Sequence, residues 1–275
     1  MMETVNISLS PQNLSNPDTS LFRLPSVVWS NLYNTMSGIA LMKSATLDSV
    51  NEGLIQIGYP NLNIDVLQSC ADTWCGTDIP NLKAMALELA TIGNVTIPAS
   101  IEKLQAQSPA FKNGKYSDGD VAAFTEILSA LHDSISTATL KGQLVNIDLK
   151  AIDSYMSNSD KYVKAAEWNQ NQVLPNSMKL SELSQENPDA QALWNDMEAF
   201  KVFFNKEWTN TVLKNVAFVN GSLGTLLSEI SNAIDAINKI SFNKNPFEVT
   251  DDFNVALIDW KTVATDAYNF SGIIG

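Results

Sequence analysis

The feature that most constrains this fold is a run of apolar residues repeated every three or four positions between Ser117 and Glu167. We call these fourteen positions the first seam, and twelve of them are apolar and none is charged: Val121, Phe124, Leu128, Leu131, Ile135, Ala138, Gly142, Val145, Leu149, Ile152, Met156, Ser159, Val163 and Ala166. No proline interrupts the run, so the spacing predicts one long helix, about 75 Å from end to end. Ser117 followed by Asp120 is typical of a capped helix start. Gly142 is a place where a neighbouring helix can come close.

A second pattern of the same kind predicts another long helix, from Pro188 to Ser241. Its positions form the second seam: Leu193, Met197, Phe200, Phe204, Trp208, Val212, Val216, Val219, Leu223, Leu226, Ile230, Ala233, Ile237 and Ile240. Gly221 and Gly224 can bend this helix or admit a close partner. The polar stretch Asn169–Asn187 between the two long helices is interpreted as a turn.

Shorter helices account for the rest of the chain. One is expected from Pro25 to about Leu54, and a second from Asn63 to Ile92, kinked or broken at Pro80 and closed by Gly93-Asn94. A short helix is possible over 98–107, and a final helix begins near Thr250. Residues 1–23 are interpreted as a flexible N-terminal tail, and 24–275 as a single domain. The predicted fold is all-α: an elongated antiparallel bundle of long helices with coiled-coil-like seams.

The composition excludes several classes of function. The chain has 30 acidic and 17 basic residues, a formal charge of −13, which argues against nucleic acid and against electrostatic docking on anionic lipid. Its single histidine, His132, removes most catalytic triads and most histidine metal sites. Cys70 and Cys75 point about 140° apart on a helix, so we expect two unbonded thiols that pack as small hydrophobes. We predict no enzyme activity, no catalytic residue, no cofactor and no metal.

Neither a signal peptide nor a spanning helix is expected. Met1 to Val5 lack the basic and apolar regions of a Sec signal. No run of 18 or more strongly apolar residues is evident, and the nearest approach is the uncharged stretch Leu24–Met42.

The order of features resembles that of a known family. The stretch Ser44–Ile64 is followed by Ala71-Asp72-Thr73-Trp74 and then Pro80, and Ala256–Val263, with Trp260, lies close to the C-terminus. This layout is similar to the α-helical pore-forming toxins: the haemolysin BL and non-haemolytic enterotoxin components, cytolysin A and the multi-component helical toxins of Gram-negative bacteria. The family places a Trp before a Pro on its second helix, here Trp74 and Pro80, and a Trp-containing helix that packs back at the end, here Trp260.

The resemblance implies a cytolytic or insecticidal toxin subunit. Such a subunit is released without a Sec signal, is a monomer in solution, and forms a hetero-oligomer with partner subunits on a target-cell membrane. The family's apolar hairpin between the long helices is replaced here by the polar stretch at Asn169–Asn187, so Leu24–Met42 becomes the candidate membrane or assembly segment. Four of its residues are expected to contact lipid or neighbouring subunits: Val28, Leu32, Ile39 and Leu41. An ordinary amphipathic bundle helix explains the same pattern.

Two other functions stay open. A non-toxic helical scaffold or secretion-associated protein would use its long seams to bind another coiled coil. An enzyme with an unrecognised site is the third reading, and it has no motif to support it.

Overall fold

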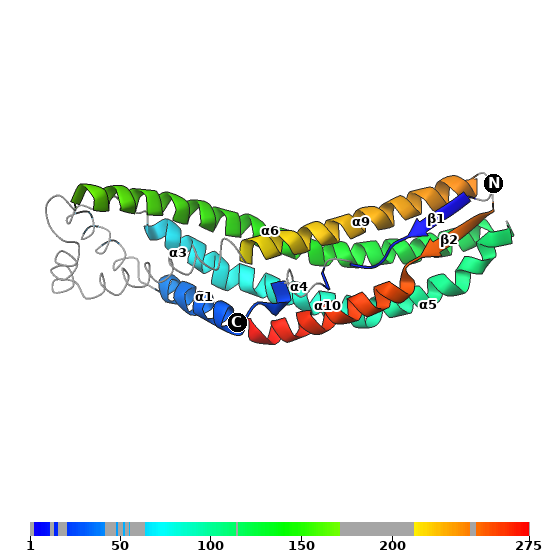
Figure 1. Cartoon of the computed structure of the whole chain (residues 1–275), viewed down its shortest axis with the longest axis horizontal. Coiled ribbons are helices and arrows are strands. Elements are labelled where there is room, and N and C mark those ends of the chain that lie inside the picture. Colours follow the sequence, from blue (N-terminus) through cyan, green and yellow to red (C-terminus); the bar gives the residue numbers. More distant parts are fainter. Residues whose placement is uncertain are drawn as a thin grey trace. The chain divides into compact units, whose positions relative to one another are not determined.

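The computed structural model of the chain describes residues 3–11, 14–15, 21–41, 48, 52, 55, 64–113, 115–170, 212–242 and 246–274. The described part is predominantly helical, with one small parallel sheet (Figure 1). The all-α prediction is therefore confirmed apart from that sheet. The chain forms two compact units. Unit 1 consists of Met1–Leu24, Asn81–Gln143 and Asn215–Ile273, and unit 2 of Pro25–Pro80, Leu144–Lys214 and Ile274–Gly275.

The elements follow the chain in a simple order. The α-helices are α1 (Ser26–Ala40), α3 (Ile64–Thr73), α4 (Ile79–Thr91), α5 (Ile97–Gln107), α6 (Asp118–Gln170), α9 (Leu213–Phe242) and α10 (Phe253–Ile273). The short helical segments are η1 (Leu21–Arg23), η2 (Trp74–Asp78), η3 (Ile92–Thr96) and η4 (Ser108–Asn113), of which η2 and η3 are π-helical turns. The strands are β1 (Glu3–Ile7) and β2 (Phe247–Asp251).

The first seam is buried wherever its side chains are described. Helix α6 runs over 53 residues, and all ten seam positions from Val121 to Ile152 are buried, Gly142 included. The last four positions, from Met156 on, have side chains outside the described residues. The predicted start is also correct, because Ser117 and Asp120 cap each other. The Asp120 backbone N–H donates to Ser117 Oγ at 3.2 Å, and the Ser117 backbone N–H donates to Asp120 Oδ2 at 2.7 Å.

The second seam is confirmed over its described half. All nine positions from Val212 to Ile240 are buried, whereas the positions from Leu193 to Trp208 lie outside the described residues, as does the turn predicted beyond residue 170. Gly142 brings α6 close to α9, as expected. A Cβ added there would lie 2.8 Å from Met85 Sδ and would also overlap the Asn220 side chain. Gly221 and Gly224 face open space, with no neighbour within 4 Å.

The prediction that Gly93-Asn94 ends a helix is wrong. Helical turns continue without a break from Ile64 to Asn113, through both η2 and η3. Gly93 is instead the place where α10 crosses η3. A Cβ at Gly93 would lie 2.9 Å from Ala264 Cβ and closer still to the Trp260 carbonyl oxygen. The glycine is therefore required by a tertiary contact. In the sequence alone, a glycine of this kind looks the same as one that ends a helix.

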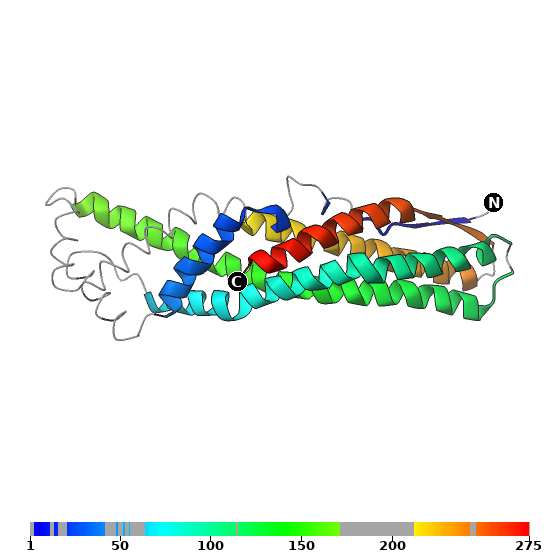
Figure 2. The ribbon, with the colours of Figure 1, turned by 90° about the horizontal axis from the view of Figure 1, so that it is seen from below.

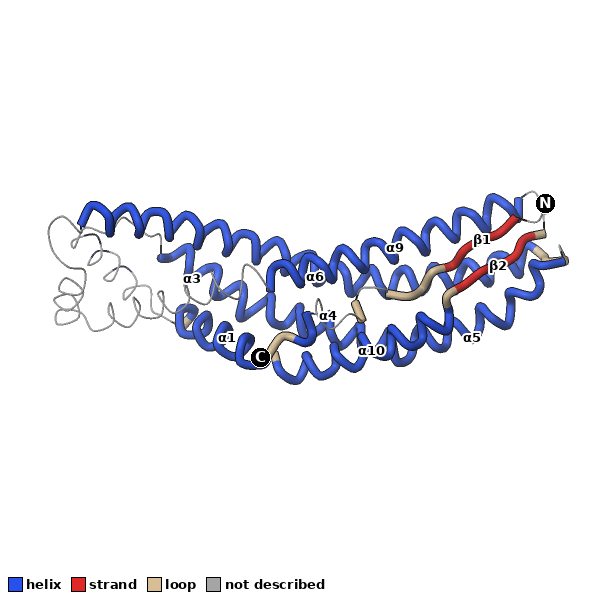
Figure 3. The backbone as a smooth tube through the Cα atoms, in the orientation of Figure 1, coloured by secondary structure: helices blue, strands red, loops and turns tan. Residues whose placement is uncertain are grey.

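The N-terminal residues form a strand, which the sequence analysis did not predict. β1 pairs in parallel with β2, with Glu3 opposite Phe247 and Ile7 opposite Asp251 (Figure 3). Val5 and Ile7 are buried, and Phe247 stacks on Phe111 with ring centroids 4.7 Å apart. The sheet is thus joined to the aromatic cluster at the end of η4 and is part of unit 1.

The flexible tail predicted for residues 1–23 is wrong for its described residues. Asp252, just before α10, accepts hydrogen bonds from the backbone N–H groups of Leu9 and Ser10 at 2.9 and 3.1 Å. Phe22 packs edge-on against Phe270, and Arg23 forms an ion pair with Asp266. Every one of these partners lies more than 240 residues away in sequence, so the local composition of the N-terminus gives no sign of them.

Helix α10 lies along η3 and α5 within unit 1 (Figure 2). It begins at Phe253, three residues later than predicted, because Thr250 and Asp251 complete β2. Its buried face is Phe253, Ala256, Trp260, Val263, Ala264, Ala267, Phe270 and Ser271. Tyr268, outside this buried face, is 65% exposed.

Candidate functional site

Trp74 and Pro80, the paired residues of the family resemblance, bracket a π-helical turn in unit 2. Pro80 was expected to kink or break the helix, since a proline has no N–H and its ring collides with the carbonyl four residues earlier. The wide turn η2 accommodates it: the Ile79 N–H donates to the Trp74 carbonyl, five residues back, and the helix continues. Trp74 itself is fully buried. A second π turn, η3, precedes Ile97-Pro98 in the same way.

Asp78, the last residue of η2, is completely buried, and the Asp148 carboxylate on α6 lies close to it. Burial, and then the nearby Asp148 carboxylate, raise the pKa of Asp78 to about 8. Two carboxylates that share one site cannot both ionise cheaply, so Asp78 keeps its proton at neutral pH. We call these two residues the carboxyl pair.

The carboxyl pair also acts on a neighbouring thiol. Burial raises the pKa of Cys70 above its usual value, and the charges of Asp148 and Asp78 raise it further. Burial and Asp72 raise the pKa of Cys75 in the same direction. Both cysteines are free, as predicted, although each is half-buried rather than fully packed. Because the thiolate is the reactive form, these thiols are poor nucleophiles at neutral pH.

The sequence analysis missed the carboxyl pair, although a signal was present. Asp78 lies on the line of buried residues formed by Ala71, Trp74, Leu82 and Met85, at helical spacing. An acidic residue on an apolar line must either be protonated or be paired. The position of Asp78 could have been noticed, whereas its partner on α6 could not.

The candidate membrane segment is packed inside unit 2. Val28 and Ile39 on α1 are buried, together with Trp29 and Met36, and α1 packs against α3 and η2. Leu41, at the end of the helix, is 80% exposed, while the side chain of Leu32 lies outside the described residues. In this conformation α1 is an amphipathic bundle helix. Among the predicted contact residues whose side chains the structure describes, only Leu41 is accessible to a partner.

Trp260, the third residue of the family resemblance, belongs to unit 1, whereas Trp74 and Pro80 belong to unit 2. Its side chain is fully buried, and Nε1 donates a hydrogen bond to the Leu9 carbonyl at 2.7 Å. It therefore fixes the chain just after β1. The Trp260 backbone also lies against Gly93, so this one residue joins the N-terminal segment, α10 and η3.

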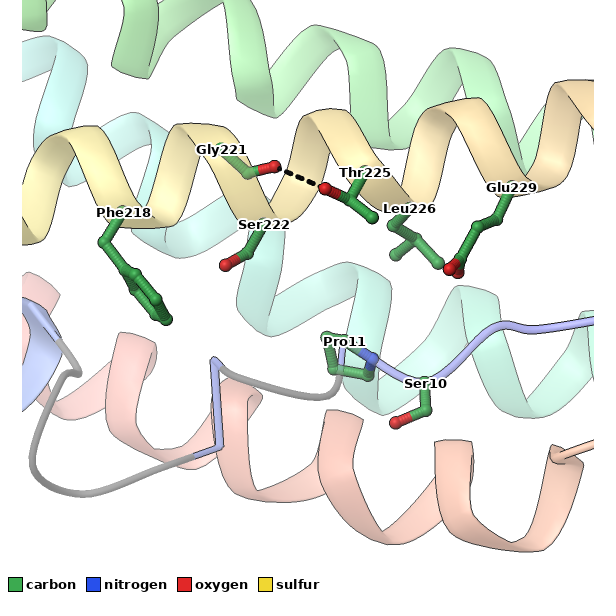
Figure 4. A pocket seen from close by; sticks show the side chains of 8 residues that line it. All are labelled: Ser10, Pro11, Phe218, Gly221, Ser222, Thr225, Leu226 and Glu229. Atoms are coloured by element: carbon green, nitrogen blue, oxygen red, sulfur yellow. Dashed lines mark hydrogen bonds between the residues drawn. The ribbon is translucent and has the colours of Figure 1, made fainter.

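A groove of about 300 Å³ in unit 1 lies between α9 and the N-terminal segment (Figure 4). Its lining is Ser10, Pro11, Phe218, Gly221, Ser222, Thr225, Leu226 and Glu229. The hydroxyl of Thr225 donates to the Gly221 carbonyl, and that of Ser10 points toward α10, where it donates to Asp259 (Figure 4). Glu229 is the one titratable group in the lining. The groove therefore holds no paired nucleophile and base.

Within the described ranges, no group of three or more His, Cys, Asp or Glu side chains is arranged so that it could hold a metal ion. No protein-family model, curated protein or solved structure matches the chain. The arrangement of its own residues is thus the basis for assigning a function.

Proposed function

We propose that this chain is one subunit of a multi-component α-helical pore-forming toxin, a cytolytic or insecticidal protein and not an enzyme. It is a monomer in solution, and it assembles with partner subunits on a target-cell membrane. In this proposal the fold is the elongated antiparallel bundle of long helices that the seams predict. The proposal starts from the resemblance carried by Trp74, Pro80 and Trp260.

The observation that carries the proposal is the helical run Gln68–Phe111. By length and composition it is apolar enough to cross a membrane. Its residues 84–101 contain a single charged residue, Glu88. The sequence analysis overlooked this run because Gly93-Asn94 was expected to end one helix and Pro98 to begin a separate short one. Less than half of its most apolar stretch is buried in the structure, and Val95 there is 62% exposed.

A core helix of a soluble bundle can have the same composition, so the proposal needs a functional test. The test is dye release from liposomes by the purified chain, alone and with the product of each neighbouring gene. We expect little release by the chain alone and strong release with one partner. If no combination releases dye from liposomes or lyses cells, the chain is not a pore-forming subunit.

Two exposed positions then identify which segment enters lipid. Val27 on α1 is 59% exposed and Val95 on η3 is 62% exposed, so lysine is tolerated at either position in the soluble fold. A lysine inside the hydrocarbon region is costly, about 2.5–3.5 kcal/mol at its centre. Loss of dye release in Val27→Lys alone assigns insertion to α1, and loss in Val95→Lys alone assigns it to 84–101. Val66→Lys, on α3 and 44% exposed, is the control.

The second candidate function is a non-toxic helical scaffold or secretion-associated protein. Exposed apolar side chains on α6, Leu144 at 54% and Ile147 at 63%, favour this reading because they lie one turn apart on a face open to another helix. A scaffold would bind a helical partner without releasing dye, and the two functions therefore differ in the same assay.

The elongated shape is tested separately, by small-angle scattering. A compact protein of this length has a radius of gyration of about 19 Å. We expect a clearly larger value, and a compact one would refute the elongated bundle.

A further inference from the structure

We propose that the groove between the open edge of β1 and helix α9 binds an extended segment of a partner protein, which adds to β1 as a third strand and places a Lys or Arg on Glu229. This inference does not rest on the toxin proposal. It concerns how unit 1 holds a partner, whatever the resulting complex does.

The open edge of β1 is the first part of the site. Within the described residues the sheet has two strands, and β2 pairs with one edge of β1. The Val5 carbonyl accepts a hydrogen bond from the Thr250 hydroxyl on β2 at 3.4 Å, so the backbone groups of Val5 face β2. Successive residues of a strand direct their backbone groups to opposite edges. Those of Thr4 and Asn6 therefore point away from β2, and in the described part of the chain no backbone group outside the sheet bonds to them.

This edge has none of the usual protections within the strand. Edge strands are commonly blocked by a Lys, a Pro or an inward charge. The residues from Thr4 to Ser8 include no charged side chain and no proline. The row of unpaired N–H and C=O groups is thus open to strand addition, a common way for one protein to bind an extended segment of another.

A groove runs along this edge, because β1 lies between β2 and α9 (Figure 1). One hollow of about 260 Å³ is lined by Thr4, Asn6 and Ser8 on one side and by Glu229, Ala233 and Ala236 of α9 on the other. Glu229 also lines the hollow of about 300 Å³ in Figure 4, so the two adjoin, and we call them together the α9 groove. The small side chains on its α9 wall leave room beside β1.

The charge of the α9 groove indicates which segment fits. Glu229 is the one titratable group among the described residues that line either hollow. Its half-buried side chain points from α9 toward the N-terminal segment (Figure 4), and within the described part of the chain it makes no hydrogen bond or ion pair. A partly buried carboxylate of this kind favours an occupant with a Lys or Arg. A second copy of the chain is a poor occupant, because each copy carries a formal charge of −13.

The experiment selects ligands for the full chain from a phage-displayed library of random peptides, each about ten residues long, the upper end of ordinary strand lengths. We expect enriched peptides that are rich in β-branched residues and carry a Lys or Arg. When such a peptide binds, hydrogen exchange measured by NMR should slow at the backbone N–H groups of Thr4 and Asn6, because the added strand accepts hydrogen bonds from them.

Variants assign the binding to the α9 groove. Glu229→Gln should weaken the selected peptides by about tenfold to a hundredfold, since a charged hydrogen bond is lost. Asp235→Asn, exposed on the same helix and outside the groove, is the matched control and should bind like the wild type. A peptide whose basic residue is replaced by Glu should lose binding to the wild type and regain it with Glu229→Lys. Asn6→Pro removes an N–H of the open edge and should abolish binding, whereas Asn6→Thr keeps that N–H and should bind.

Several outcomes would overturn the proposal. One is a selection that enriches no peptide, and another is a set of peptides that bind the wild type and Glu229→Lys equally well. Unchanged exchange at Thr4 and Asn6 in the bound state would refute strand addition. Slower exchange there on raising the concentration of the chain alone would identify a second copy as the occupant instead. If Asn6→Pro does not fold, the exchange measurement and Glu229→Lys decide.

Discussion

Replacing Gly93 with alanine tests whether a close approach of α10, rather than a helix end, explains this glycine. A Cβ at Gly93 would lie 2.9 Å from Ala264 Cβ, whereas carbon atoms in contact prefer 3.5–4.0 Å. The Trp260 carbonyl oxygen lies closer still, and it is backbone that cannot rotate away. Overpacking of a tight core contact costs about 1–3 kcal/mol.

The alanine also gains helix propensity, which opposes this cost by up to about 1 kcal/mol. Taking the upper end of the overpacking range, because backbone is involved, Gly93→Ala should lower the free energy of unfolding by about 2 kcal/mol. For a chain of this size that corresponds to a fall in Tm of about 4–8 °C. The assay is urea and thermal denaturation followed by circular dichroism at 222 nm.

Two matched controls separate crowding from the loss of a glycine. Gly221→Ala, in the same unit, and Gly76→Ala, in the other π turn, meet no atom within 4 Å. Both should leave stability unchanged or raise it by up to about 1 kcal/mol. The reasoning fails if Gly93→Ala is as stable as these two variants.

Three more predictions follow from buried groups. The raised pKa of Asp78 means that the folded chain keeps a proton that an unfolded Asp, of pKa 3.8, releases. The contribution of Asp78 to the free energy of unfolding is therefore greatest below about pH 4. As the pH rises toward 8, this contribution falls by up to about 1.4 kcal/mol per pH unit. Asp78→Asn should remove that slope in urea denaturation across pH 5–8, and an identical slope in both proteins would contradict it. Trp260→Phe leaves the buried Leu9 carbonyl without its donor, at a cost of about 1–3 kcal/mol; hydrogen exchange should increase across β1, and unchanged protection there would show that the bond does not hold the strand. Leu131→Ala in the first seam should cost about 2–5 kcal/mol, whereas Leu140→Ala, at a position 58% exposed, should cost far less; equal losses in chemical denaturation would contradict the assigned faces.

The buried faces of the long helices could be predicted because their information is local and repeated. Every described position of both seams, from Val121 to Ile152 and from Val212 to Ile240, is buried as its spacing indicated. A period of three to four residues is set by the geometry of the helix itself. No partner needs to be known before it can be recognised.

Features that depend on distant residues could not be predicted in this way. Strand β1 is five residues long and pairs with residues 244 positions away, so no local turn indicates it. Gly93 was interpreted as the end of a helix, but its role is to let α10 pack closely against η3. The position of Asp78 could be recognised in the sequence, but the pKa of its carboxyl group is raised by burial and then by Asp148, which lies 70 residues further along the chain on α6.

The pairing of β1 with β2 has a consequence for biosynthesis. Glu3 is synthesised 244 residues before its partner Phe247. At 5–20 residues per second this delay is roughly 12–50 s. During that time Val5, Ile7 and Leu9, all buried in the folded protein, are exposed on an unpaired strand. The charge of Glu3 and the ring of Pro11 flank this apolar stretch, as gatekeeper residues do in strands that must avoid aggregation. Unit 1 is therefore completed only after β2 has been made, and the unpaired β1 segment is a natural binding site for a chaperone during synthesis.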